Sequence, residues 1–150
     1  MLFKDSFYQL TDYLPRKSPG SQGTHGRAWS VRRGIVGLAW RLEENRSEST
    51  VPNNVKELIQ NWGMLKEEAE VAPERQTSLC YLVKAQNQSP VAAIYLDAEA
   101  KDQFGERGAK ALMAVIEQSV ESYGLCQSLE QVWGQVRGSS PLIELYGANK

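Results

Sequence analysis

SLCYLVKAQNQSPVAAIYLD, residues 78–97, carries two apolar runs on either side of a polar break. The runs are Leu79–Ala85 and Val91–Leu96, and the break at Gln86–Pro90 contains Asn, Ser and Pro. Runs of this length, rich in Val, Ile, Leu and Tyr and joined by a short turn, predict an antiparallel hairpin. With the turn centred on Asn87-Gln88, the numbers of each opposed pair of residues sum to 175.

This register gives the hairpin two unlike faces, because side chains alternate along a strand. The apolar face carries Leu79, Tyr81, Val83, Ala92, Ile94 and Leu96. The mixed face carries Ser78, Cys80, Leu82, Ala93, Tyr95 and Asp97. An edge hairpin facing water would alternate more cleanly between apolar and polar residues. We therefore expect the hairpin to lie in the middle of a sheet that is covered on both sides.

The rest of the chain reads as one domain, residues 1–150, in which strands and helices are mixed. Strands or extended pieces are predicted at Ser6–Leu14 and Arg27–Val31, helices at 33–42, 53–62, 65–70, 104–123 and 125–137, and a polar connector at Glu43–Pro52. An antiparallel hairpin connected by helical excursions indicates the α+β class rather than a doubly wound parallel sheet.

Helical spacing also predicts which residues the helices bury. Leu112, Val115, Ile116 and Val120 should cover the apolar face, and Ile35, Leu38 and Leu42 should form the stripe of the first helix. Glycine at position 37 suits close packing of that helix against other backbone.

Composition excludes several classes of protein. The longest apolar run, Gly34–Trp40, is far shorter than the roughly 20 residues that cross a bilayer, so no membrane segment is expected. The N-terminal MLFKDSFYQL lacks the apolar region of a signal peptide, which favours a cytoplasmic location. Residues 1–41 hold seven Lys or Arg against two Asp, which fits an anion site or simply a solvated face. The net charge of −1 disfavours nucleic acid as a partner.

Side chains that bind metals or react as nucleophiles are sparse. Cys80 and Cys126 fit burial as small hydrophobes better than a redox role. His25 has no His or Cys at ligand spacing, and Glu67, Glu68 and Glu70 read as a charged helix face, so no metal site is expected. Asp97 has no partner acid, base or nucleophile in a recognisable motif. Its simpler role is to bind backbone groups where the strand ends, and we expect no enzyme.

Two segments together resemble a GAF domain, a family of small-molecule sensor and regulatory domains. One is Arg33-Gly34-Ile35-Val36-Gly37-x-Ala39. The other is the hairpin, with Ser78-Leu79-Cys80 in one strand and Val91-x-x-x-Tyr95-x-Asp97 in the next, followed by Phe104. Their order and separation match the family over about residues 6–125.

The resemblance implies a central antiparallel sheet with terminal helices on one face and loops and short helices enclosing a cavity on the other. The mixed face would floor the cavity, so the resemblance implies ligand-binding residues at Trp29, Trp40, Trp62, Ser78, Cys80, Tyr95 and Asp97. A purely structural role is the alternative for each tryptophan and for Ser78. The family's signatures for bilins, cyclic nucleotides and methionine-sulfoxide reduction are absent here, and no cofactor is expected. The opening strand and helix look short before Ser6, as in a piece of a larger protein.

Two classes of function fit these features. In the first, the protein is a non-catalytic sensor whose cavity takes a small molecule and signals to an effector domain or partner protein. In the second, its own side chains fill the cavity and it is a protein–protein interaction or dimerisation module, expected to form a homodimer. The working surface would then be Leu129, Val132, Trp133 and Val136.

Overall fold

The computed structural model describes residues 6–11, 26, 28–52, 54–70 and 76–138. At residue 29 and at residues 133–138 the description is limited to the backbone.

The predicted hairpin is present and supplies two strands of the three-stranded sheet. It consists of β4 (Thr77–Lys84) and β5 (Pro90–Ala98), which pair antiparallel. Their pairs keep the predicted register, with numbers that sum to 175, as far as an irregularity between Val83 and Lys84. The register is therefore confirmed, and the apolar and mixed faces are the ones expected.

A third strand, β3 (Arg46–Glu48), pairs antiparallel with β4 and gives the sheet the order β3-β4-β5. It lies within Glu43–Pro52, so our prediction that this whole segment is a polar connector was wrong. The sequence Arg-Ser-Glu has no strand signal of its own, and pairing with β4 imposes the extended conformation. β4 is the central strand and is buried up to Val83, whereas β5 is an edge of this three-stranded sheet. Within the described structure, the prediction that the hairpin lies in the middle of the sheet therefore holds for β4 and is wrong for β5.

A separate two-stranded sheet joins β1 (Ser6–Tyr8) to β2 (Ala28–Ser30). β2 confirms the predicted extended piece. The prediction for Ser6–Leu14 holds only at its start, because the strand ends at Tyr8; residues 12–14 lie outside the described ranges. With strands that are antiparallel throughout the described sheets and helices on either side, the α+β class is confirmed.

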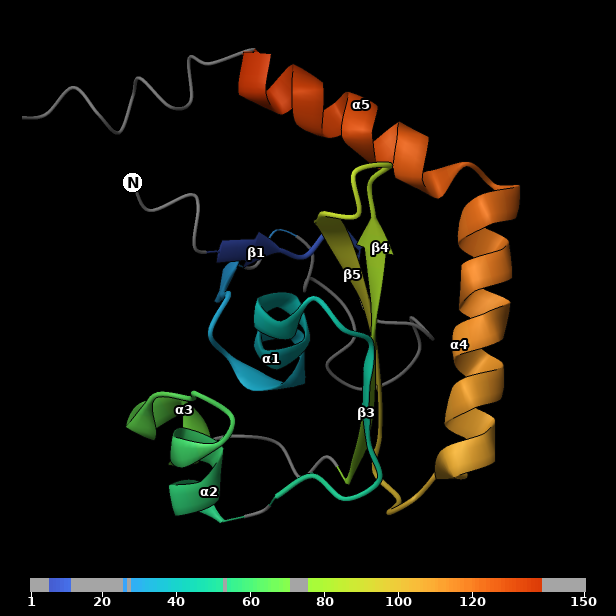
Figure 1. The fold of residues 1–150 in the computed structure, drawn as a ribbon. Helices are drawn as coiled ribbons and strands as arrows, with labels where there is room; N and C mark the ends of the chain where they lie inside the picture. The colour runs from blue at the N-terminus through green and yellow to red at the C-terminus, as the bar shows by residue number, and fades with distance from the viewer. Residues whose placement is uncertain (1–5, 12–25, 27, 53, 71–75, 139–150) are drawn as a thin grey trace, which may run out of the picture.

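The apolar face is covered by α4 (Gly105–Ser122), as Figure 1 shows, and the first residues of α5 (Leu125–Gly138) pack on the same cluster. The α4 residues that pack there are Ala109, Leu112, Met113, Ile116 and Val120, at helical spacing. Val115 was predicted to join them, but its side chain is 60% exposed because it lies outside that stripe.

The mixed face is covered by α1 (Gly34–Leu42), which begins the group of helices on the opposite side of the sheet from α4 (Figure 1). Ile35 and Ala39, four positions apart, are the buried apolar residues of α1, whereas Leu42 is 47% exposed and does not continue the predicted stripe. A Cβ at Gly37 would lie 2.6 Å from the Val31 carbonyl oxygen, which confirms the predicted close packing.

Two short helices, α2 (Val55–Gln60) and α3 (Lys66–Glu70), lie beyond α1 on the same side of the sheet (Figure 1). The side chain of Asn54 accepts a hydrogen bond from the Glu57 amide and so caps α2, within the predicted helix 53–62. Within the described ranges, no helix combines the length and the apolar character that membrane crossing requires.

Candidate functional site

The predicted ligand-binding residues of the hairpin come together on the mixed face, in two rows that cross all three strands. The first row is Glu48, Ser78 and Asp97, and the second is Arg46, Cys80 and Tyr95. Side chains in one row lie directly opposite one another, at Cβ separations of about 5 Å. Both rows follow from the register, because residues two apart on a strand point to the same face.

Trp40 and Trp62 reach the same face from outside the sheet. Both pack, together with Tyr95, against a buried cluster made of Ile35, Ala39, Cys80 and Leu82. Ile35 is 2% exposed and Ala39 is fully buried, so side chains of α1 fill the space over the centre of the mixed face. The resemblance implied a cavity here, and in this state of the molecule the centre of the face is closed.

Trp29 is the predicted wall residue whose side chain lies outside the described part. Its backbone belongs to β2 and pairs with Phe7 of β1. The ring of Phe7 meets the ring of Trp40 edge-on, with centroids 4.8 Å apart. β1 therefore contacts the cover of the mixed face, and β2 is paired with β1.

Ser78 is the most unusual residue of the site. Its side chain is 1% exposed, and its Oγ has no hydrogen-bond partner among the described residues. A buried hydroxyl without a partner costs free energy, and most buried polar groups are hydrogen-bonded. In the neighbouring row, the Nε of Arg46 is likewise buried and unpartnered within the described ranges, while its Nη2 lies 3.8 Å from Oε2 of Glu44.

Burial also sets the chemistry of the cysteines. It raises the pKa of the Cys80 thiol to about 12, which leaves this side chain neutral and unreactive at ordinary pH. Cys126 is half-buried at the start of α5, and its Sγ donates a hydrogen bond to the Lys84 carbonyl oxygen. Burial, and to a lesser extent Glu130, raise its pKa as well. Neither thiol is in an environment that activates a nucleophile.

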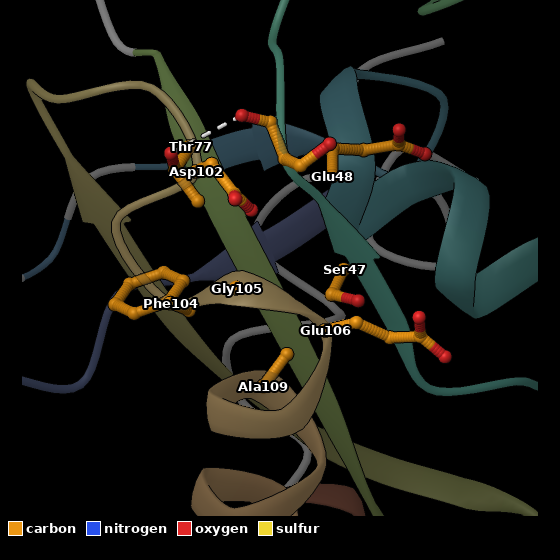
Figure 2. A pocket seen from close by; sticks show the side chains of 9 residues that line it. Ser47, Glu48, Thr77, Asp102, Phe104, Gly105, Glu106 and Ala109 are labelled. Carbon is orange, nitrogen blue, oxygen red and sulfur yellow. Dashed lines mark hydrogen bonds between the residues drawn. The ribbon is translucent and has the colours of Figure 1, made fainter.

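A second hollow, which no sequence pattern predicted, lies at the other face of the sheet (Figure 2). It has a volume of about 370 Å³ and opens between β3 and the first turn of α4. Its lining is Ser47, Glu48, Ser49, Thr77, Asp102, Phe104, Gly105, Glu106 and Ala109. The hydroxyl of Thr77 is fully engaged, since it donates to the Ala100 carbonyl and accepts from the Gln103 amide.

The residues of the predicted interface on α5 differ in burial. Leu129 packs against the apolar face of the sheet and so belongs to the core rather than to an exposed stripe. Val132, less than one turn further on, is 54% exposed. For Trp133 and Val136 the structure gives only the helical backbone.

The side chains considered above as metal ligands, and not expected to form a site, are partly described. Among the residues that the structure describes, no three His, Cys, Asp or Glu side chains are grouped so as to hold a metal ion. Glu68 instead forms an ion pair with Arg33, at 2.9 Å. His25 lies outside the described ranges.

No protein-family model, curated protein or solved structure matches this chain. The resemblance to GAF domains therefore remains a prediction from the quoted residues.

Proposed function

We propose that this chain is a non-catalytic regulatory domain that binds a small molecule over the mixed face of β3-β4-β5 and signals to an attached or partner effector. One observation carries the proposal. The buried, unpartnered hydroxyl of Ser78 lies directly opposite Asp97, beside the cluster on which Trp40 and Trp62 pack. Ligand sites in proteins combine aromatic walls with a few convergent polar groups in this way.

The groups on this face suit a ligand with both a flat apolar part and polar substituents. The rings of Trp40, Trp62 and Tyr95 offer stacking surfaces. The Ser78 hydroxyl can donate or accept a hydrogen bond. The row that contains Ser78 also contains two carboxylates, from Glu48 and Asp97. We therefore expect hydrogen-bond donors on the ligand where it meets this row.

Because α1 fills the centre of the face, binding has to be coupled to a change of conformation. A ligand can shift the protein only by binding the open state more tightly than the closed one. The affinity measured for the ligand is then weakened by the fraction of molecules that are closed. The same coupling supplies a signal, since ligand binding changes the position of the elements that cover the sheet.

A thermal-shift screen of nucleotides and small metabolites, followed by native mass spectrometry, tests the proposal. A stabilising compound is expected, and Ser78→Ala should reduce its shift in melting temperature while the variant stays folded. Ser47→Ala is the matched control, because Ser47 is exposed on the opposite face and lines the second hollow. A compound whose shift depends on Ser47 and not on Ser78 would place binding in the second hollow and overturn the proposal.

A dimerisation module is the second candidate, favoured by the exposure of Val132 just beyond the packed Leu129. Val132 and Val136 are four positions apart in the sequence, so they share one side of the helix, and this side is the proposed seam of the dimer. Charged residues in α5 are confined to Glu130 and Arg137, so a second copy of this helix would meet little like-charge repulsion.

Light scattering on Val132→Glu tests this candidate. The mass should fall from that of a dimer to that of a monomer, because the substitution places a charge on the seam. Gln131→Glu adds the same charge at the adjacent exposed position and should leave the mass unchanged. An equal mass for wild type and Val132→Glu would remove α5 as the interface.

A further inference from the structure

Helices α2 and α3 form a small lobe with a core of its own. Leu58, Met64 and Ala69 are 6%, 9% and 5% exposed and pack together in a cluster that is separate from the sheet's two clusters. The Met64 amide closes the lobe by donating to the Leu58 carbonyl oxygen. Hydrogen bonds also cap each helix at its start. Asn54 bonds with Glu57 in α2, and the Glu68 carboxylate accepts from the Leu65 amide in α3. The lobe therefore has packing and hydrogen bonds of its own, apart from its contacts with the sheet.

Several contacts join this lobe to the start of α1, and three of them involve Trp62 or Glu68. Trp62 is the residue that packs against both the lobe cluster and the cluster over the mixed face. The Gly34 amide donates a hydrogen bond of 2.8 Å to the Trp62 carbonyl oxygen. Nη1 of Arg33 forms the 2.9 Å ion pair with Oε1 of Glu68, whose other oxygen caps α3.

We propose that the α2–α3 lobe is a gate for the mixed face, with Trp62 as its plug and the Arg33–Glu68 pair as its latch. The gate swings as an intact unit, and its opening withdraws the indole of Trp62 from the cluster that contains Cys80. This inference rests on the proposed small-molecule function, for which it supplies the moving part. We call the contacts between the lobe and the start of α1 the joint. The inference requires that these contacts break while both the lobe and the sheet stay folded.

The joint is well suited to such opening. The side chains of Arg33 and Glu68 are 24% and 29% exposed, so water can solvate both charges once they separate. The other described contacts between the two bodies include the Trp62 indole, one amide hydrogen bond and the close approach of Gly63 to the Arg32 carbonyl oxygen. Regions that open separately from the whole protein are those with few buried contacts to the remainder.

Amide hydrogen exchange of the free protein, followed residue by residue by NMR, tests the gate. The Gly34 amide reports the joint, the Asn61 and Met64 amides report the lobe, and the Gly37 amide, bonded to the Arg33 carbonyl, reports α1. The gate predicts a lower protection factor at Gly34 than at the other three. Equal protection at Gly34, Asn61 and Met64 would mean that the joint opens only when the lobe unfolds, which overturns the proposal.

Arg33→Gln should lower protection at Gly34 by about two- to fivefold, the factor expected for a partly exposed ion pair, and leave Asn61 and Met64 unchanged. Glu68→Gln is a second route to the same result, because a glutamine can still accept from the Leu65 amide. Lys66→Gln is the matched control, since it removes a positive charge from a pair exposed on the outside of the lobe. Unchanged protection at Gly34 in both latch variants would also overturn the proposal.

This experiment contains no ligand, so its outcome is independent of the ligand screen. An opening joint without any stabilising compound would leave the gate standing and remove the proposed function. If a compound stabilises the protein in a way that depends on Ser78, and the joint does not open, the proposed function stands and the gate is overturned.

Discussion

Thr77 and Ser78 are adjacent buried hydroxyls on opposite faces of β4, and within the described structure hydrogen-bond partners are found for Thr77 alone. Thr77 fastens the loop that leads into α4 to the sheet. Ser78 points to the mixed face with nothing described within hydrogen-bond reach. Because the two residues have similar burial and chemistry, they allow a direct comparison.

Removing each hydroxyl should have opposite effects on stability. Thr77→Val should lower the free energy of unfolding by about 1–3 kcal/mol, because it leaves the Gln103 amide and the Ala100 carbonyl without this hydrogen-bond partner. Ser78→Ala should be neutral or should stabilise by up to about 1 kcal/mol, since an unpartnered buried hydroxyl carries only a desolvation cost. Urea denaturation of both variants measures the difference. A loss of more than about 1 kcal/mol in Ser78→Ala would show that this hydroxyl is satisfied, contrary to the proposed site.

Two helical glycines should also respond in opposite ways to alanine. At Gly37 a Cβ would lie 2.6 Å from backbone atoms of Val31 and Arg32, so Gly37→Ala must push the chain apart and should cost about 2 kcal/mol or more. At Gly108 a Cβ would meet nothing within 4 Å, and Gly108→Ala should stabilise α4 by about 0.5–1 kcal/mol. Thermal melts give both values. A tolerated Gly37→Ala would mean that α1 does not pack against Val31 and Arg32 as described.

Truncating the plug should make the mixed face accessible to a small aromatic molecule. Trp62→Ala should cost about 2–4 kcal/mol, somewhat less than for a fully buried tryptophan. Millimolar indole should raise the melting temperature of this variant and not that of the wild type, because the vacated space is apolar. Tyr123→Ala, which truncates an 84% exposed ring, is the control and should show no response. An indole effect of the same size in the control would argue against a specific site at Trp62.

Alkaline pH should weaken the fold through Cys80. Its pKa is raised from 9.0 to about 12 in the folded protein, so the unfolded chain loses the thiol proton first. The contribution of the neutral thiol is complete below pH 9 and is lost as the pH rises toward 12, by up to about 1.4 kcal/mol per pH unit. Urea denaturation of wild type and Cys80→Ala between pH 8 and pH 10.5 should show their stability difference shrinking. A constant difference would indicate that the thiol is not desolvated.

The hairpin could be predicted from sequence because two independent signals agree. Apolar alternation defines which side chains share a face, and the polar break between the runs places the turn, so the register of β4 and β5 follows from local information. Local signals also located α4 and α2, because the spacing of apolar residues that predicts a helix lies within a few residues.

The missed features depend on contacts between distant segments. β3 is three polar residues that become a strand by pairing with β4. The orientation of α4 excluded Val115, since two helical stripes share Leu112 and Ile116 and only packing selects the one with Ala109 and Met113. The closure of the mixed face and the Arg33–Glu68 pair join residues 35 positions apart or more, which no local pattern specifies. These tertiary contacts determine the candidate site.

The backbone of Arg32 lies where three segments meet. Its carbonyl oxygen accepts a 2.8 Å hydrogen bond from Nη1 of Arg41, and a Cβ at Gly63 would lie 2.5 Å from the same oxygen. Gly37 approaches the same peptide unit from α1. Because these contacts involve the main-chain atoms of residue 32, its side chain can be replaced during evolution. The glycines at positions 37 and 63 cannot be replaced, because a side chain there would collide with that backbone. Distant homologues should therefore be recognisable by this pair of glycines after the surrounding side chains have diverged.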